Sequence, residues 1–234
     1  MAAHTLLLQQ FPLLKSLSAE TLELLAPKAS IREFSKREMV LTKGPPSPYL
    51  CFLLEGRLQA LDFTAEGREV GLYFIDPGDY FAELSLIDGE TQPEFVIATS
   101  KSQVLLLHGA DVRPVLFSNP TLAEAISRRL AQRVRQQLTQ RQVLGLNNPM
   151  HRICAQLLTM TTTNAGGATT TVVANMRTLR APTHQELAIM VNLTRETVTR
   201  TFQVLQAQGV VTRQGDDLVV DAAKLEELAK EKQK

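Results

Sequence analysis

Five short runs of β-forming residues between positions 31 and 107 constrain the fold of this chain more than any other feature. Glycine, proline and aspartate separate them, as in Lys43-Gly44-Pro45-Pro46 and Asp76-Pro77-Gly78-Asp79. Short strands at this spacing predict an antiparallel barrel or jelly roll. The five runs are Tyr49–Leu54, Leu58–Phe63, Val70–Phe74, Phe95–Thr99 and Val104–Leu107.

A long helical segment follows the runs, over residues 119–145, with Asn119 as its expected N-cap and Pro120 at its first position. Apolar residues recur every fourth position and form one narrow stripe, while arginines crowd the other faces. So narrow a stripe favours pairing with the same helix of a second copy, and packing against the chain's own barrel is the alternative. The stripe consists of Leu122, Ile126, Leu130, Val134 and Leu138.

The pattern changes again at Asn147-Asn148-Pro149, which predicts a hinge and a new helix through Leu158. Residues 161–171 predict a loop or hairpin turn, with strands at Val172-Val173 and Met176–Leu179. The sequence therefore predicts an α+β chain in three parts. These are a β domain over residues 1–118, a helix and hinge over 119–148, and a C-terminal domain over 149–234.

Residues 182–209 have the pattern of a helix-turn-helix. Thr183 and Glu186 form a capping box that opens one helix, and Val191-Asn192-Leu193 makes the turn. Thr194 caps a second helix, which Gly209 ends. The apolar residues of both helices fall on inward faces, as the motif requires: Leu187, Ala188 and Val191 on the first, and Val198, Phe202 and Leu205 on the second.

The first turns of the second helix are polar, which is where a recognition helix holds its base-reading side chains. Arginine binds guanine O6 and N7 with two hydrogen bonds, and glutamate accepts from cytosine N4. A helical hairpin with a solvated charged face is the alternative. A predicted β-hairpin around Gly215-Asp216, typical of a winged helix, disfavours it. The candidate DNA-binding residues are Thr183, Thr194, Arg195, Glu196, Thr199 and Arg200.

Charge is distributed unevenly along the chain. Residues 1–118 carry 10 basic and 15 acidic residues, whereas residues 119–234 carry 15 basic and 9 acidic ones. A basic C-terminal half suits binding to phosphate backbones. Two cysteines, no apolar run long enough to span a membrane and no basic leader predict a protein of the reducing cytoplasm, with no membrane partner. No arrangement typical of catalysis occurs in the sequence, which predicts that the protein is not an enzyme.

Three segments resemble the CRP/FNR family of bacterial transcription regulators, and the resemblance covers nearly the whole chain. Tyr49-Leu-Cys-Phe-Leu-Leu-Glu-Gly-Arg-Leu58 and Pro77-Gly-Asp-Tyr-Phe-Ala-Glu-Leu84 resemble its sensor domain, which is a cyclic-nucleotide-binding jelly roll. Thr194-Arg-Glu-Thr-Val-Thr-Arg200 resembles the recognition helix of its cyclic-AMP-responsive members. The resemblance implies an effector-sensing domain, a homodimer about the long helix and palindromic double-stranded DNA with TGTGA-like half-sites. It makes Arg195, Glu196 and Arg200 base readers, and RNA polymerase a partner.

The sensor half departs from the family's pattern. Cyclic-AMP binders hold the phosphate with an arginine followed by serine or threonine, where this chain has Gln92 and Pro93. Ala82 replaces a glycine that allows the ligand to approach the backbone. Glu83 is retained, either to bind a ribose hydroxyl or to cap a turn. These changes predict that cyclic AMP is not bound in the usual way, and they leave the effector unnamed.

Other sensing chemistries have little support in the sequence. Arg129 and Arg133 could contact an anionic effector, since the long helix lines the family's effector pocket, or could form a solvated face. Cys51 and Cys154 are too few for an iron–sulfur cluster and fit as buried apolar residues. His108 is a poor candidate for a haem ligand, so we expect neither cofactor. The competing function is a cyclic-nucleotide-binding module that acts on a protein partner, which has no need of the recognition-helix motif.

Overall fold

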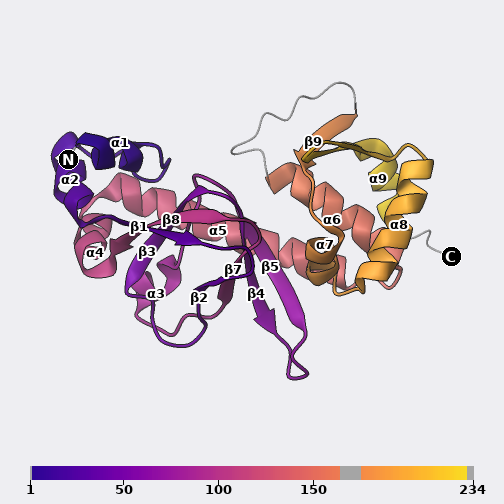
Figure 1. The fold of residues 1–234 in the computed structure, drawn as a ribbon, viewed down its shortest axis with the longest axis horizontal. Helices are drawn as coiled ribbons and strands as arrows, with labels where there is room; N and C mark the ends of the chain where they lie inside the picture. The colour runs from indigo at the N-terminus through magenta and orange to yellow at the C-terminus, as the bar shows by residue number, and fades with distance from the viewer. Residues whose placement is uncertain (1, 164–174, 231–234) are drawn as a thin grey trace. The chain divides into compact units, whose positions relative to one another are not determined.

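The computed structural model describes residues 2–163 and 175–230, which fold as two compact units (Figure 1). The N-terminal unit comprises the chain up to Arg68 together with Leu72–Arg133, and the C-terminal unit comprises Glu69–Gly71 together with the chain from Val134 onward. The long helix α5 (Pro120–Leu144) contributes its first half to one unit and its second half to the other.

The N-terminal unit is built on two four-stranded sheets, with strand orders β1-β8-β3-β6 and β2-β7-β4-β5. Side chains from both sheets form a core around Leu53, Leu58 and Phe81. This arrangement confirms the predicted jelly roll. The strands are β1 (Ser30–Phe34), β2 (Met39–Leu41), β3 (Tyr49–Glu55), β4 (Leu58–Phe63), β5 (Glu69–Ile75), β6 (Tyr80–Phe81), β7 (Phe95–Ala98) and β8 (Ser102–His108).

All five predicted strands are present, as β3, β4, β5, β7 and β8, and β4 has the predicted bounds. The sequence missed β1, β2 and β6. In β1 the first four residues are exposed, so the strand shows no apolar alternation. The strands β2 and β6 are only three and two residues long. Their pairing partners, rather than their own sequences, define them as strands.

Helices form a second core against the barrel. It includes Leu8, Phe11, Leu22, Leu116 and, from the start of α5, Leu122 and Ile126. The helices are α1 (Ala2–Gln9), α2 (Ala19–Leu25), the 3-10 turn η1 (Ala26–Lys28), α3 (Glu83–Asp88) and α4 (Gly109–Ser118).

The apolar stripe of α5 divides between two environments. Leu122 and Ile126 are buried in the core of the N-terminal unit, and Leu130 is partly buried against it. Val134 and Leu138, further along the same face, are 60% and 58% exposed. The alternative of packing against the barrel is therefore correct for the first half of the stripe. Asn119 caps the helix as predicted, since its side chain accepts from the backbone N–H of Leu122 at 3.1 Å.

The C-terminal unit combines helices with a three-stranded sheet of order β10-β11-β9. The helix that opens at Pro149 continues to Thr163, so the prediction of a loop is wrong for residues 161–163, and the rest of that predicted loop lies outside the described residues. The predicted strand at Val172-Val173 lies outside the described residues. The elements are α6 (Pro149–Thr163), β9 (Met176–Arg180), α7 (His184–Val191), α8 (Arg195–Ala207), β10 (Val211–Gln214), β11 (Asp217–Asp221) and α9 (Ala222–Ala229). Over the described residues, none of the helices has the length and apolar character that a membrane crossing requires.

Candidate DNA interface and buried sensor site

A capping box begins α7, as the sequence predicts. The Thr183 hydroxyl accepts from the backbone N–H of Glu186 at 3.2 Å, and the Glu186 carboxylate accepts from the backbone N–H of Thr183 at 2.7 Å. These two bonds satisfy backbone groups that the helix itself leaves unpaired. The Thr183 side chain is therefore engaged in fixing where α7 starts.

The turn between α7 and α8 depends on one residue with left-handed backbone. Asn192 has φ 51°, and the backbone N–H of Leu193 donates to the carbonyl of Ala188 at 3.0 Å. Asparagine tolerates this conformation better than most residues. Thr194 then caps α8 by accepting from the backbone N–H of Thr197 at 3.2 Å. The predicted helix-turn-helix is thus confirmed in its caps and its turn.

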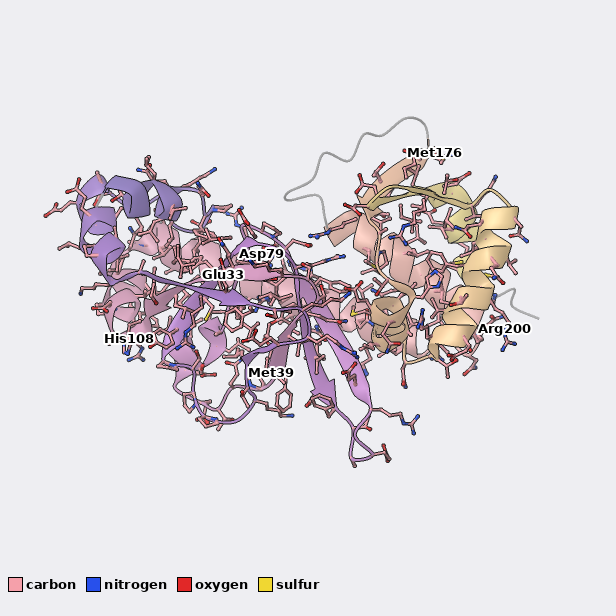
Figure 2. All side chains as sticks on the ribbon, in the orientation of Figure 1. Glu33, Met39, Asp79, His108, Met176 and Arg200 are labelled. Atoms are coloured by element: carbon pink, nitrogen blue, oxygen red, sulfur yellow. The ribbon has the colours of Figure 1, made fainter. Side chains whose placement is uncertain are left out.

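The helix α8 separates apolar from polar side chains as predicted. Its inward residues Val198, Phe202 and Leu205 are buried, while Arg195, Glu196 and Arg200 are exposed. Figure 2 shows Arg200 at the outer side of α8. Hydrogen bonds from its own backbone N–H and from Thr194 hold the pKa of Glu196 below its usual value, so this carboxylate is an ionised acceptor. The exposed face of α8 therefore presents two cations, Arg195 and Arg200, and one anion, Glu196.

Thr199, which is also a candidate DNA-binding residue on α8, has a different environment. Its hydroxyl donates to the carbonyl of Arg195 at 2.9 Å and lies 2.9 Å from Nδ1 of His184. The His184 ring also packs on Phe202, with centroids 4.9 Å apart. Sequence analysis missed His184 because its position in the capping box carries no mark of a contact fifteen residues away.

A β-hairpin, the wing of the predicted winged helix, comes after α8 in the chain. Strands β10 and β11 pair antiparallel with Val211 opposite Val220, and Gly215 turns the hairpin with φ 60°. Strand β9 pairs with β11 on its other side, which makes the predicted hairpin part of a three-stranded sheet. Arg213 on β10 donates from Nε to the carbonyl of Gly215 at 3.2 Å. The hairpin and α8 together form the winged helix-turn-helix.

A cluster of polar residues that includes predicted effector contacts is buried in the N-terminal unit, and we call it the sensor site. Arg133 of α5 is its centre: Nη1 donates to the Glu83 carboxylate, and Nη2 donates to the carbonyl of Tyr80 at 3.1 Å. The guanidinium also lies over the Tyr73 ring, 4.6 Å from its centroid. Glu83 is 0% exposed. The sensor site comprises Tyr73, Tyr80, Glu83, Gln92, Glu94 and Arg133.

These contacts exclude a solvated position for Arg133 and show how Glu83 is engaged. A solvated face is wrong for Arg133, because its side chain is buried. Glu83 forms an ion pair with Arg133 at the start of α3, and its contact with a ribose hydroxyl stays a prediction. Arg129, one turn earlier, pairs with Asp79 at 2.8 Å and remains partly exposed.

Glu94 and Tyr73 were missed by sequence analysis. The Tyr73 hydroxyl donates to the Glu94 carboxylate, and Glu94 is almost completely buried. Burial raises the pKa of Glu94 above its usual value. A single glutamate before a strand gives no sign that it is buried, so only the tertiary structure could identify this residue.

Gln92 is also buried, and its hydrogen bonds stay within the barrel. Its backbone exchanges two hydrogen bonds with Gly44, at 2.8 and 2.9 Å, and its side-chain oxygen accepts from the Ser85 hydroxyl at 3.3 Å. Pro93 is exposed and has no N–H to donate. Ala82 is buried with φ 65°, a conformation that favours glycine.

The residues of the sensor site do not fit a cyclic phosphate. Its one guanidinium is engaged by Glu83 and by the Tyr73 ring, and a second carboxylate, Glu94, is buried close to it. A phosphate there would meet two acidic side chains and no free cation among the residues of the site. Like charges at short range in a low dielectric repel strongly.

The cysteines and the sensor-half histidine have structural positions. Cys51 and Cys154 are buried, and burial raises the pKa of each thiol to about 12, which makes both unreactive. His108 caps α4 by accepting from the backbone N–H of Ala110 at 3.2 Å. The described part of the chain contains no cluster of three or more histidine, cysteine or acidic residues placed to hold a metal ion.

Comparison with known proteins agrees with both halves of the fold. Residues 31–119 match the cyclic nucleotide-binding domain, and residues 151–228 match the Crp-like helix-turn-helix domain. The chain belongs to the CRP/FNR family of transcriptional regulators. The cyclic AMP receptor protein of Thermus thermophilus is 26% identical over 93% of this chain and 96% of its own length. The cAMP-activated global transcriptional regulator CRP of Pasteurella multocida is 26% identical over 86% and 94%.

Solved structures of the CRP/FNR family share the fold. FixK2 from Bradyrhizobium japonicum superposes with a TM-score of 0.72 at 21% identity, over 88% of this chain and 99% of its own. The relatives are transcription regulators rather than enzymes, and the helix-turn-helix identifies DNA as the partner of the C-terminal unit.

Proposed function

We propose that this CRP/FNR regulator binds palindromic DNA as a homodimer and is controlled by a small effector other than cyclic AMP in the usual mode. The observation that carries the proposal is the exposed row of Arg195, Glu196 and Arg200 on α8, in a helix-turn-helix whose caps and turn are complete. Side chains at these positions of a recognition helix reach base edges in the major groove.

The three residues have different tasks in this proposal. Arg195 and Arg200 present planar guanidinium groups that suit guanine O6 and N7, and Glu196 suits the cytosine amino group. A TGTGA-like half-site offers both kinds of base. Thr183 and Thr194 contribute through the helix starts that they cap, and Thr199 through its contact with His184.

The exposed half of the α5 stripe supports dimerisation. Val134 and Leu138 are large apolar side chains on one face of a helix, and leaving both in water is unfavourable. A second copy of α5 would cover them and place two recognition helices on a palindrome. We therefore expect Leu138→Glu to yield monomers in sedimentation analysis, with an unchanged fold.

The effector proposal rests on the charge of the sensor site. Arg133 is already paired with Glu83, and Glu94 adds a second buried carboxylate, which disfavours an anionic ligand such as cyclic AMP. An anionic effector held by Arg129 or Arg133 would first have to displace Asp79 or Glu83. RNA polymerase is the protein partner that we propose, since a transcription regulator acts on its recruitment or progress.

The test is fluorescence anisotropy with a duplex that carries TGTGA and TCACA separated by roughly six base pairs, so that the half-sites lie one helical turn apart. A scrambled duplex is the control, and both are titrated with and without cyclic AMP over a salt series. We expect tight, sequence-dependent binding that cyclic AMP does not change.

Two results would contradict the proposal. Equal and salt-sensitive binding to both duplexes would leave only a non-specific basic surface. A strong requirement for cyclic AMP would show that the sensor site holds phosphate despite Glu83 and Glu94.

A further inference from the structure

His184 lies where three elements of the winged helix-turn-helix meet. It occupies the first turn of α7, contacts Thr199 of α8 through Nδ1, and is close enough to Arg213 of β10 for that charge to affect it. The ring also packs against Phe202, with the two ring planes tilted by 45°. A half-buried histidine beside the recognition helix is therefore fixed in position by hydrogen bonding and by packing.

Thr199 determines which ring nitrogen of neutral His184 carries the proton. A threonine hydroxyl has a single hydrogen, and that of Thr199 is donated to the carbonyl of Arg195. In its 2.9 Å contact with His184, the Thr199 oxygen must therefore accept, so Nδ1 carries the hydrogen. In the neutral ring Nε2 is then a bare acceptor, and it becomes a donor only when the ring is protonated.

We propose that His184 is a proton-dependent contact to the DNA backbone: the imidazolium donates from Nε2 to a phosphate oxygen, and the neutral ring cannot. The proposal rests on the DNA-binding function proposed above. The first helix of this motif crosses the backbone while the second reads the groove, which places the start of α7 near phosphates. A neutral Nδ1–H ring would present a lone pair to the phosphate, which repels it.

The groups around His184 determine its pKa in the free protein, and therefore the direction in which DNA binding shifts that pKa. Burial, Arg195 and Arg213 hold the pKa of His184 below its usual value in the free protein. Glu186, on the same helix, is engaged by the backbone of Thr183. From α6, Arg152 donates to carbonyls at the opposite end of α7.

Bound phosphates would shift the protonation equilibrium of His184 toward the imidazolium, because their negative charges offset those of Arg195 and Arg213. The pKa of His184 is then higher in the complex than in the free protein. Binding therefore takes up a proton, and affinity falls as the pH rises through the pKa of the complex.

The first measurement needs no substitution. Binding of the full-length protein to the palindromic duplex is titrated over a salt series at about pH 6 and about pH 8. We expect roughly tenfold tighter binding at the lower pH, and a slope of log K against log salt that is steeper by about 1.8, the value for two further phosphate contacts, one from each protomer of the proposed homodimer.

Two substitutions of His184 distinguish the contribution of its positive charge from that of the imidazole ring. His184→Asn keeps a group that can bond Thr199 but has nothing in place of Nε2, so its affinity should be weak and nearly independent of pH. His184→Arg is charged throughout, so its affinity should be high at both values. The control is His108→Asn, which preserves the cap of α4 in the other unit and should retain the full pH effect. Circular dichroism and the melting temperature establish that each variant is folded.

The outcomes separate this inference from the proposed function. If the wild type binds the palindrome specifically but with the same affinity and salt slope at both pH values, the role of His184 is refuted and the DNA-binding function stands. The same holds if His184→Asn retains the pH effect. If no variant prefers the palindrome at either pH, the proposed function itself fails.

Discussion

Charged side chains are exposed on the polar face of α8 but buried in the sensor site. On α8, Arg195, Glu196 and Arg200 are exposed. In the sensor site, Arg133 and Glu83 are buried and bind each other. A surface that reads another molecule keeps its charged groups hydrated until the partner replaces the water, whereas a buried charge must be paired within the fold. Substitutions should therefore change binding at the first region and stability at the second.

The largest effect should follow from breaking the buried pair. Arg133→Ala leaves Glu83 without its partner, and we expect a loss of about 3–5 kcal/mol in the free energy of unfolding of the N-terminal unit. The three tyrosines of the chain, Tyr49, Tyr73 and Tyr80, all lie in that unit, and there is no tryptophan. Tyrosine fluorescence in a urea titration therefore reports on this unit alone.

The matched control lies on the same helix. Arg128 forms an exposed pair with Glu124 at 2.6 Å, and Arg128→Ala should lower the free energy of unfolding by less than about 0.5 kcal/mol. Equal effects of the two substitutions would mean that burial does not distinguish the two arginines, and the comparison would fail.

Substitution of a proposed base reader should change DNA binding and leave stability nearly unchanged. We expect Arg200→Ala to reduce discrimination at one base pair of each half-site by about 1–3 kcal/mol. The melting temperature should stay within about a degree or two of the wild type, because an exposed side chain contributes little to folding. Competition binding with single-substituted duplexes locates the affected base pair. A uniform loss of affinity on every duplex would instead make Arg200 a phosphate contact.

Removing a helix cap should destabilise the protein by less than breaking the buried ion pair does. Thr183→Ala removes the acceptor for the backbone N–H of Glu186, which should destabilise α7 by about 1 kcal/mol. Hydrogen exchange of α7 peptides measures the loss locally. Gln185→Ala, an exposed neighbour without a capping bond, is the control and should leave exchange unchanged. Alanine favours a helix at least as well as glutamine does, so equally fast exchange in both variants would mean that the loss does not come from the cap.

The smallest effect is expected at Ala82. Its left-handed backbone costs about 1 kcal/mol relative to glycine. Ala82→Gly would remove that strain but also a buried methyl group, which contributes about 0.8 kcal/mol. The free energy of unfolding should thus stay within about 0.5 kcal/mol of the wild type, given these two opposing contributions. A clear stabilisation in the urea titration would show that the methyl group is poorly packed.

The sequence alone determined the features whose signals are local. The capping box at Thr183 and Glu186, the turn at Asn192 and the separation of inward from outward residues on α8 are all present in the structure. Each depends on residues within about one helical turn of one another, where backbone geometry links spacing to contact directly. The main strands followed for the same reason, from runs bounded by turn residues.

Only the tertiary structure decided the contacts between distant residues. Arg133 and Glu83 are separated by 50 positions, Tyr73 and Glu94 by 21, and His184 and Thr199 by 15. Pairing across such distances depends on strand register and helix packing, which residue types alone do not specify. For the same reason the sequence could not show which half of the α5 stripe is buried. The sequence therefore predicted the exposed polar face of α8, whereas the buried ion pair of Arg133 with Glu83 and the contact of His184 with Thr199 required the fold.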